Sequence, residues 1–461
     1  MTEAREDHVV TQQPTPKEAP GPQGSVLFGA LSEFKKDTLR LLVELRRQYG
    51  GVSRMKMGPY LVHQVTSPEA VKHVLQDNPR NYVRGRFYRG FTLFFGRGML
   101  TTDGPEWKAR RAVSQPFFHK PRLRAGAPVI TDTVGQLFDK WDGVADRGEQ
   151  LDITDDMMWV AMGVLGRLLY GVDLRDYAER LLPSVRFSLK AMIITGEVKQ
   201  MLPKWIPTRY QRELKRHQAV LNGVMDEIID LHRAGGGSPD SVVTALLNGQ
   251  HAEGRPFTQR EIRAELKTLF LAGHETTGCA LTWTLYAVSQ HADVRRRLEA
   301  ELAEVLDGRA PTADDLADLP YLRQVVDETL RMYPPIWLFP RDTVADDVIA
   351  GYHVPAGTTV LIPPYAAHHD PEHWPNPEAF DPERFCPARK APDRYAYFPF
   401  GGGNRKCIGM DLALLELQLV VAMVVQRYRL DLAGGNPVRA AALVSLRPQP
   451  QVMMAVHRRK S

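Results

Sequence analysis

A glycine-rich stretch that ends in a single cysteine constrains this chain more than any other feature. Residues 398–410 read FPFGGGNRKCIGM, and the run that follows, DLALLELQLVVAMVVQRY, predicts an apolar helix. Cys407 therefore stands where the unpaired backbone N–H groups of a helix start converge, which favours the thiolate form of its side chain. The stretch predicts a metal ligand placed between a tight loop and a helix.

The residues around Cys407 restrict the metal. No second cysteine or histidine lies at zinc-ligand spacing, so a tetrahedral zinc site is disfavoured, whereas haem iron accepts one thiolate as its only protein ligand. Gly401 and the two glycines after it lack a Cβ, so the backbone can turn sharply against a flat ring. Arg405 stands within reach of a propionate, and Gly409 allows close approach at the helix start.

Five residues of this stretch resemble, in their spacing, the haem-binding signature of the cytochrome P450 family. They are Phe400, Gly403, Arg405, Cys407 and Gly409. The resemblance implies that Cys407 is the iron ligand of haem b, iron protoporphyrin IX. The alternative interpretation is a glycine-rich loop that ends in a buried structural cysteine.

A long apolar helix is predicted from a capping box at Thr258 and Glu261 to about residue 291. Its middle reads LAGHETTG, where Ala272 and Gly273 leave room beside the helix. Thr276 can donate a hydrogen bond back to the carbonyl of Ala272 and so open the helical ladder locally. The segment predicts a helix that crosses the whole domain and is interrupted at its centre.

Glu275 and Thr276 put an acid and an alcohol inside this apolar helix. Splitting dioxygen requires protons delivered into a pocket that is otherwise dry, and a hydroxyl resupplied through a carboxylate meets that need. The two residues resemble the acid and alcohol pair of the cytochrome P450 family, which implies that Ala272 and Gly273 lie beside the haem. The alternative is a polar kink in a core helix.

The same resemblance assigns further haem contacts. Trp107 and Arg111 are four residues apart on a predicted helix and resemble the donors to a haem propionate, as does Arg341. The segment around Trp107 is basic, and we expect its charges to attract an acidic electron carrier. These charges are Lys108, Arg110, Lys120 and Arg122, together with Lys406.

Glu328 and Arg331 share a face of the helix predicted from residue 320 to residue 332. With Arg384, in the segment DPERF, they resemble the structural Glu, Arg, Arg network of the family, whose role is folding and haem retention. A neighbouring run of His368, His369 and Asp370 looks like a metal cluster, but the family uses such residues structurally.

The substrate pocket is the least determined part of the site. Residues 82–100 are rich in aromatic residues and glycine, and the resemblance makes this segment a lid over the substrate; the alternative is an aromatic packing loop. The segment YPPIWLFPR is extended because of its prolines. The residues predicted to line the pocket are Phe87, Phe91, Ile193, Ile336 and Leu338.

No linker divides the 461 residues, which predicts one large domain, mainly α with a small β region by resemblance to the cytochrome P450 fold. Residues 1–24 are polar and rich in proline, which predicts a disordered tail before a haem domain at 25–461. Three cysteines without disulfide spacing indicate a reducing cytoplasm. The N-terminal segment has no apolar run long enough to predict a membrane anchor. The sequence also has no basic block interleaved with aromatic residues, so we expect no nucleic-acid binding.

The resemblance implies a monomeric monooxygenase that inserts one oxygen atom of dioxygen into an apolar small molecule by hydroxylation or epoxidation. A terpenoid, a fatty acid or another secondary metabolite is the expected substrate. No flavin or iron–sulfur segment follows Cys407, so we expect a separate ferredoxin and ferredoxin reductase to supply electrons. The alternatives are desaturation or oxidative coupling on the same scaffold, and a non-catalytic haem sensor.

Overall fold

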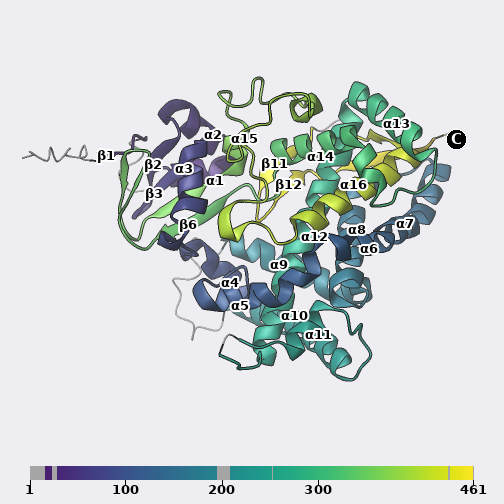
Figure 1. Cartoon of the computed structure of the whole chain (residues 1–461), viewed down its shortest axis with the longest axis horizontal. Coiled ribbons are helices and arrows are strands. Elements are labelled where there is room, and N and C mark those ends of the chain that lie inside the picture. Colours follow the sequence, from purple (N-terminus) through teal and green to yellow (C-terminus); the bar gives the residue numbers. More distant parts are fainter. Residues whose placement is uncertain (1–15, 23–28, 195–207, 252, 435–436, 460–461) are drawn as a thin grey trace, which may run out of the picture.

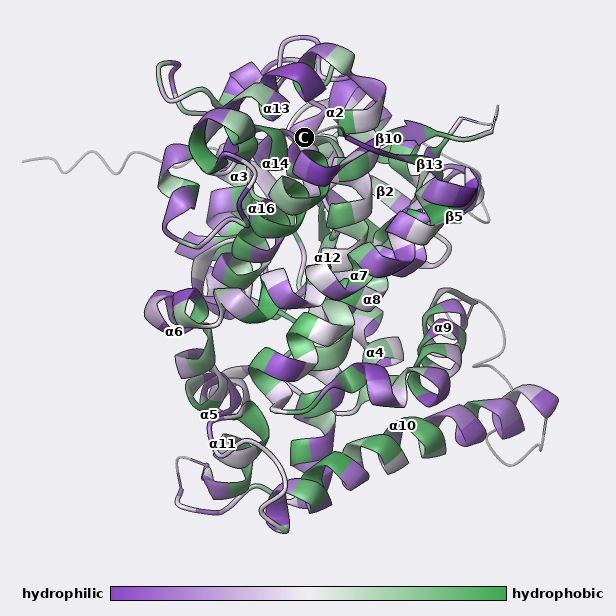
Figure 2. Cartoon of the chain, turned by 90° about the vertical axis from the view of Figure 1, so that its right-hand side faces the viewer, coloured by the Kyte–Doolittle hydropathy of each residue, from purple (hydrophilic) through white to green (hydrophobic). Residues whose placement is uncertain are grey.

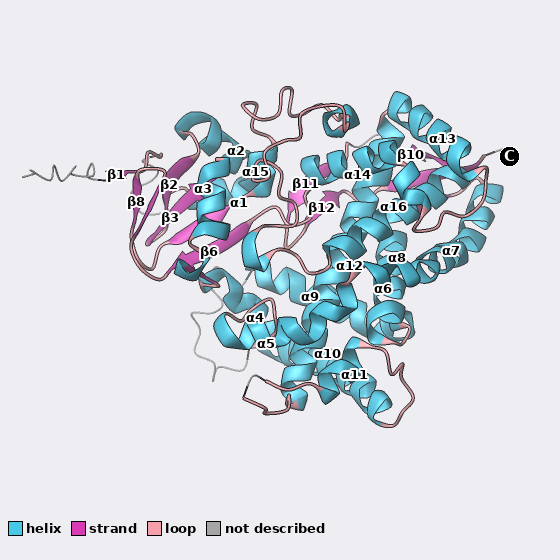
Figure 3. Ribbon diagram, in the orientation of Figure 1, coloured by secondary structure: helices cyan, strands magenta, loops and turns pink. Residues whose placement is uncertain are grey.

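The computed structural model describes residues 16–22, 29–194, 208–251, 253–434 and 437–459 (Figure 1). Most of these residues lie in helices, and the strands form small sheets (Figure 3), which confirms the predicted fold class. The helices are α1 (Leu31–Lys36), α2 (Thr38–Tyr49), α3 (Pro68–Lys72), α4 (Arg89–Phe95), α5 (Gly104–Ser114), α6 (Lys120–Ala125), α7 (Ala127–Arg147), α8 (Ile153–Leu165), α9 (Ala178–Ile194), α10 (Arg209–Arg233), α11 (Val242–Asn248), α12 (Gln259–Gln290), α13 (Ala292–Leu306), α14 (Pro320–Met332), α15 (Pro364–His368) and α16 (Met410–Arg427).

The described strands form sheets in the orders β2-β3-β9-β6-β4, β1-β8-β7, β10-β13-β5 and β11-β12. Residues 52–65 form a hairpin of β2 paired with β3, and Gly58 at its turn has a φ of +60°. The strands are β1 (Lys17–Glu18), β2 (Val52–Met57), β3 (Tyr60–Val65), β4 (Tyr82–Val83), β5 (Gln150–Asp152), β6 (Phe339–Thr343), β7 (Asp347–Ile349), β8 (Tyr352–Val354), β9 (Thr359–Ile362), β10 (Tyr428–Leu432), β11 (Arg439–Ala442), β12 (Leu446–Gln449) and β13 (Met453–Arg458).

Part of the predicted N-terminal tail is structured, so the prediction for residues 1–24 needs a correction. Strand β1 pairs in parallel with β8, with Lys17 opposite Tyr352, and Ala19 is 2% exposed. No local pattern predicts this strand, because its partner lies far along the chain and its own two residues are polar. Residues 1–15 and 23–28 lie outside the described part of the chain.

Helix α12 runs through the middle of the molecule, and α8, α14 and α16 pack against it (Figures 1 and 2). The predicted capping box starts it, because Thr258 and Glu261 exchange side-chain and backbone hydrogen bonds. Its 32 residues span about 48 Å at 1.5 Å per residue. Apart from Ala272, nearly all of its central residues are buried or half-buried, so α12 is the axis on which the core is built.

Helix α8 approaches α12 closely at two glycines. A Cβ on Gly273 would stand 2.7 Å from a methyl carbon of Leu165, and one on Gly278 would stand 2.5 Å from the sulfur of Met158. The space that we expected Gly273 to leave open is therefore filled by α8, whereas Ala272 keeps its side chain exposed.

Helix α14 has the predicted bounds, residues 320–332, and a carboxylate from α13 caps its start. The backbone N–H groups of Tyr321 and Leu322 donate to Glu301 at 2.6 and 2.8 Å. Among the described residues, no single helix is both long and apolar enough to span a membrane, although Ile153–Tyr170 and Leu174–Met192, bent by 116°, meet those conditions as a pair.

Candidate active site

The loop that carries Cys407 is shaped by its backbone. The Cys407 N–H donates to the carbonyl of Phe400 at 2.9 Å, and Gly401 and Gly403 adopt φ values of +69° and +61°. A Cβ on Gly403 would stand 1.8 Å from the carbonyl oxygen of Leu75, so no other residue fits there without moving the backbone. The loop thus delivers the thiol to the start of α16 independently of the cysteine side chain.

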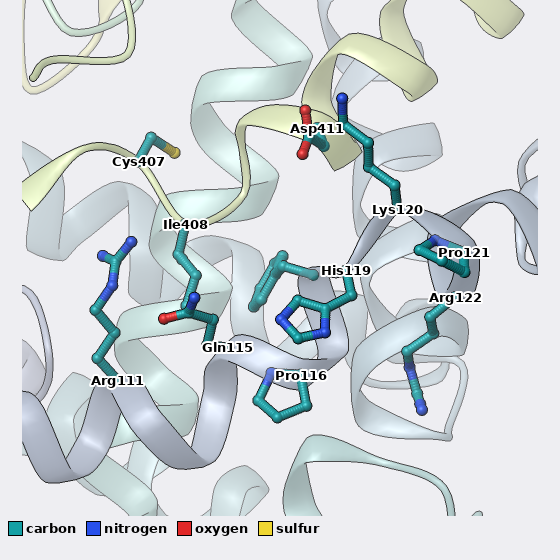
Figure 4. Close-up of a pocket in the computed structure, with 11 residues that line it drawn as sticks. Arg111, Gln115, Pro116, His119, Lys120, Pro121, Arg122, Cys407, Ile408 and Asp411 are labelled. Atoms are coloured by element: carbon teal, nitrogen blue, oxygen red, sulfur yellow. The ribbon is translucent and has the colours of Figure 1, made fainter.

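The side chain of Cys407 is exposed and borders a hollow of about 650 Å³ (Figure 4). Desolvation by the protein around it raises the pKa of the Cys407 thiol, and the Gly409 N–H and the charges of Arg111 and Lys406 oppose this only in part. The N–H group at the helix start therefore lowers the pKa of the thiol, as expected, but by less than desolvation raises it. A further positive charge at the sulfur is needed to hold it deprotonated, and a metal ion supplies one.

The centre of α12 borders an internal space. Ala272 is exposed although residues on both sides of it in α12 are buried, and Thr276 is half-buried. The Thr276 hydroxyl donates to the Ala272 carbonyl at 2.6 Å, as the sequence predicts, but α12 is a continuous helix from Gln259 to Gln290, so the expected interruption at its centre is not found. Helix α16 begins directly after the Cys407 loop and packs against α12.

Glu275 is 2% exposed and binds the hairpin β11–β12. Its Oε1 accepts hydrogen bonds from Arg447 Nε at 2.6 Å and from the Ser445 hydroxyl at 2.5 Å, and Arg447 Nη2 donates to Oε2. Although burial alone would raise it, these bonds and the charge of Arg447 lower the pKa of Glu275. Neither Arg447 nor Ser445 was predicted as a partner of Glu275 from the sequence.

Three arginines converge at a second wall of the site. The Arg341 guanidinium, 5% exposed, donates to the hydroxyl of Tyr88 at 3.2 Å, and that of Arg84 lies 5.0 Å from the Tyr88 ring centre. Burial and the charge of Arg341 lower the pKa of Arg84 to about 10, and burial and the charge of Arg84 lower the pKa of Arg405 to about 9. Although burial would raise it, the charges of Arg341 and Arg84 lower the pKa of Tyr88.

The predicted pair Trp107 and Arg111 lies next to this cluster. The guanidinium of Arg405 stacks 4.0 Å from a ring centre of Trp107 and donates to the Thr102 carbonyl at 2.6 Å. Arg111 donates to the carbonyl of Lys406 at 3.2 Å and borders the hollow beside Cys407. Of the two, Trp107 therefore lies nearer to the arginine cluster.

This donor set fits the haem that the sequence predicts. The guanidinium groups of Arg84, Arg341 and Arg405 lie close enough to interact electrostatically with one another, and Asp103 lies beside Arg84 and Arg405. This group of positive charges suits a ligand with two carboxylates, and Arg84 Nε has no hydrogen-bond partner among the described residues. A lone thiolate is a suitable iron ligand. Sequence reasoning missed Arg84 and Tyr88.

Glu328, Arg331 and Arg384 meet in the interior. Arg331 and Glu328 are both 0% exposed and form two hydrogen bonds of 2.7 and 2.8 Å, and Arg384 Nε lies 3.4 Å from Glu328. The guanidinium of Arg331 also donates to the carbonyl of His368 at 2.8 Å. Every strong donor of Arg331 is thereby directed at an acceptor, as a buried charge requires.

His368 connects this network to the Cys407 loop. Its Nε2 accepts a hydrogen bond from the Phe398 N–H at 3.0 Å, so its Nδ1 is the protonated nitrogen and faces the Arg331 carbonyl at 3.2 Å. Burial lowers the pKa of His368 well below its usual range. Asp370 pairs instead with Arg46, at 2.6 Å, so these residues have structural partners.

The residues predicted to line the substrate pocket lie in different surroundings. Phe87 is 37% exposed, and Phe91 is half-buried with its ring centre 5.8 Å from that of Tyr88. Ile336 is half-buried, while Leu338 packs against a small apolar cluster that includes residues 42 and 361. Ile193 lies in α9, and its side chain is outside the described residues.

The basic segment is smaller than predicted. Arg110 is 1% exposed and pairs with Glu106 at 3.0 Å and with Glu265 at 3.5 Å, so it belongs to the core. Arg122 pairs with Asp240 at 2.5 Å. Of the five predicted charges, those of Lys108 and Lys120 are exposed, and Lys120 borders the hollow.

Comparisons with known proteins agree with these observations. A sequence profile described as "Cytochrome P450" matches residues 19–454. "Cyclooctat-9-en-7-ol 5-monooxygenase" from Streptomyces melanosporofaciens is 34% identical over 90% of both chains, and "Cyclooctatin synthase" from the same organism is 32% identical over 94% of both. The crystal structure of the "cytochrome P450DA heme domain" aligns with a TM-score of 0.85 at 23% identity, covering 97% of this chain and 99% of that one.

Proposed function

The chain belongs to the cytochrome P450 family and is a haem-dependent monooxygenase, and on this premise we propose that it hydroxylates or epoxidises an apolar small molecule. The reaction consumes substrate, dioxygen, two protons and two electrons, and yields the oxygenated product and water. One observation carries the proposal: α16, which begins directly after the Cys407 loop, packs against α12, in which Ala272 is exposed and Thr276 is half-buried. Arg405 of the three-arginine cluster precedes Cys407 by two residues.

We assign the cofactor contacts as follows. Cys407 binds the iron of haem b, and Arg84, Arg341 and Arg405 bind its two propionates, with Trp107 packed beside them. Haem bound in this way supplies the chemistry of dioxygen activation, which thiolate donation assists. Phe400, Gly401 and Gly409 shape the loop under the ring, and Arg111 lies on its outer side. Ala272 and Gly273 form the opposite wall, where Ala272 alone faces open space.

Thr276 and Glu275 deliver protons in this proposal. The Thr276 hydroxyl is half-buried at the centre of α12 and donates to the Ala272 carbonyl, and by turning away from that carbonyl it can donate to a bound molecule. Glu275 is the next residue, and a buried carboxylate beside a hydroxyl is suited to resupply it. The apolar remainder of α12 keeps water away from the reacting centre.

The substrate class follows from the relatives. One relative is named as a monooxygenase of cyclooctat-9-en-7-ol, which is an unsaturated alcohol. This similarity favours a terpenoid-like substrate over a fatty acid for the present chain. Phe87, Phe91 and Ile336 supply apolar surface that fits such a molecule. Desaturation and oxidative coupling are the alternatives, and the monooxygenase relatives speak against a haem sensor.

Replacement of Thr276 by alanine tests the reaction and the role of the hydroxyl together. We expect wild-type protein to place one atom of isotopically labelled dioxygen in its product. The variant should bind substrate but form product about 10²-fold less per reductant consumed, the range of a lost positioned proton donor, with hydrogen peroxide replacing product. Mass spectrometry and peroxide assay measure both. A product without label would contradict oxygen insertion, and full coupling in the variant would contradict the role of Thr276.

A separate ferredoxin with its reductase is the electron donor that we propose. The hollow beside Cys407 (Figure 4) is bordered by Arg111, His119 and Lys120, so an acidic protein docked there stands close to the thiol. A matched charge reversal, Lys120→Glu, should slow reduction by an acidic ferredoxin several-fold and weaken its dependence on salt.

The control for this experiment is Lys215→Glu, on α10, where the lysine is exposed and does not line the hollow. Stopped-flow reduction at low and high ionic strength measures the effect. Equal rates for Lys120→Glu, Lys215→Glu and wild type would refute docking at this hollow.

The proposal also keeps the cytoplasmic location and the monomeric state that the sequence predicts. The cytoplasmic location is supported by the three free thiols of Cys279, Cys386 and Cys407, which suit a reducing compartment.

A further inference from the structure

A buried ion pair joins the proposed proton donor to a hairpin near the carboxyl end of the chain. Arg447 lies in β12, with its side chain 27% exposed, and contacts both oxygens of Glu275, which is 2% exposed. The Ser445 hydroxyl donates to the same carboxylate at 2.5 Å. Three donors from one short hairpin therefore hold Glu275.

The turn of this hairpin is fastened to two other parts of the site. The indole N–H of Trp283, in α12, donates to the carbonyl of Leu446 at 2.9 Å, and the Leu446 N–H donates to the carbonyl of Pro335, also at 2.9 Å. The indole N–H of Trp337 donates to the carbonyl of Leu443 at 2.8 Å. The hairpin thus lies between the proton donor and the segment of Ile336, which we propose to line the pocket.

This arrangement conflicts with proton delivery while it persists. A carboxylate that accepts three hydrogen bonds from a guanidinium and a hydroxyl is stabilised as an anion and has no proton to give. Moreover, its oxygens are directed at β12, and the Thr276 hydroxyl bonds the Ala272 carbonyl instead of Glu275. Glu275 must leave Arg447 before it can carry a proton.

We propose that Arg447 is a positioning residue that holds Glu275 as an anion on the hairpin β11–β12, and that displacement of this hairpin by a bound substrate releases Glu275 for proton delivery. The inference rests on the proposed role of Glu275 and deepens it. Because Trp337 and Pro335 bind the hairpin turn, a molecule that moves the Ile336 segment moves the turn with it. Protons then reach the site when substrate is present and are withheld when it is absent.

The proton steps balance without another reactant. Released Glu275 takes one proton from water on the hairpin side, and solvent buffer restores that proton. It passes the proton to the Thr276 hydroxyl, which passes its own proton inward, and Glu275 returns to Arg447 as a carboxylate. Two such transfers supply the two protons of the overall reaction, while the electrons come from the redox partner.

The charged and titratable groups around Glu275 come from four elements. Burial lowers the pKa of its neighbour His274 to about 4, so this imidazole stays neutral. Burial raises the pKa of the Cys279 thiol to about 12, and Cys279 Sγ lies 3.5 Å from the Ser445 hydroxyl. Arg186 of α9 pairs with Asp155 of α8 at 3.0 Å. Against the opposing effect of burial, the charge of Asp155 helps to raise the pKa of Arg447, and the charge of Arg186, like burial, lowers the pKa of His274. Arg447 is the group whose hydrogen bonds and charge lower the pKa of Glu275 most.

Removing the guanidinium should therefore reverse the behaviour of Glu275. In Arg447→Gln, burial is no longer opposed, so the pKa of Glu275 rises above its ordinary value. Dithionite-reduced, substrate-free holoenzyme is mixed with oxygenated buffer, and its return to the oxidised spectrum is followed over a range of pH. We expect the variant to reoxidise about tenfold faster than wild type, with a rate that falls as pH rises through the new pKa of Glu275. Arg447→Lys should restore slow reoxidation in part, because it returns a positive charge.

A second measurement does not depend on turnover. Infrared difference spectra of holoenzyme with isotope-labelled glutamate should show a protonated carboxyl in Arg447→Gln at neutral pH, which is lost in Arg447→Gln/Glu275→Gln. Hydrogen exchange of residues 439–449 should accelerate in Arg447→Gln. Arg439→Gln, an exposed arginine on the same hairpin, is the matched control and should change none of these results.

The outcomes separate this inference from the function on which it rests. If Glu275→Gln leaves coupling and reoxidation unchanged, Glu275 is not the proton donor and that part of the proposed function fails. If Glu275→Gln is impaired but Arg447→Gln retains the rate, the pH profile and the infrared spectrum of wild type, the inference fails alone. If Arg447→Gln folds poorly, Ser445→Ala, which removes one donor, must show the same changes to a smaller degree, and their absence overturns the inference.

Discussion

Replacement of Cys407 by serine should abolish the thiolate-type absorption of the reduced carbon monoxide complex, and turnover with it. A serine hydroxyl stays protonated where a thiol ionises, so it offers the iron no comparable electron donation. The change removes one polarisable atom and leaves the loop intact, because the loop is held by the Cys407 N–H bond to the Phe400 carbonyl and by Gly403, not by the sulfur. We therefore expect a folded protein with altered or absent haem.

Cys386→Ser is the matched control, since Cys386 is a half-buried free thiol that does not line the hollow beside Cys407. Both variants should show the far-ultraviolet circular dichroism of wild type. Survival of the thiolate-type spectrum in Cys407→Ser, or its loss in Cys386→Ser, would contradict the assignment of the iron ligand.

Replacement of Glu328 by glutamine should lower the free energy of unfolding by about 3–5 kcal/mol, the cost of leaving a buried charge without its partner. Arg331 is 0% exposed and directs two donors at Glu328, and Arg384 approaches the same carboxylate at 3.4 Å. Two buried guanidinium groups would lose their anion together. Most of the expressed protein should therefore fail to retain haem.

The control is Arg323→Gln on the same helix. Arg323 pairs with Asp327 at 2.7 Å, but its side chain is 46% exposed, so its loss should cost less than about 1 kcal/mol. Denaturant titration of haem-free protein and haem content after purification measure the two effects. Equal free energies of unfolding for the Glu328 and Arg323 variants would show that the interior network stabilises the protein no more than a surface ion pair does.

Much of the scaffold could be predicted because its signals are local. The capping box of Thr258 and Glu261, the turn at Gly58 and the bounds of α14 each depend on residues within one or two turns of chain. The spacing around Cys407 is equally local. Such patterns predict structure well because the residues that interact are close together in the sequence.

The side chains around the centre of the site were harder to foresee because their partners are distant in sequence. Arg84 and Arg447 are single residues in a chain with 59 lysines and arginines, and no spacing distinguishes them from solvated charges. Only the folded chain shows that Arg447 meets Glu275.

Arg110 was predicted to lie on an exposed basic surface, and the structure places it in the core. A run of lysines and arginines on an amphipathic helix indicates a solvated basic face, and Lys108 conforms to this. Arg110 instead lies in the core because Glu265, far away in α12, provides a buried carboxyl whose pKa is raised by burial to about 7. The charge count of a segment therefore overstates the charge of its surface.

The imidazole of His368 has a consequence for how damage spreads through this enzyme. One nitrogen holds the Phe398 amide at the root of the cysteine loop, and the other faces the backbone of Arg331. The imidazole thus tethers the loop to the end of α14, so a loosening of α14 is transmitted to the cysteine loop. Substitutions that loosen α14 should therefore first broaden the absorption band of the bound haem, before the protein unfolds.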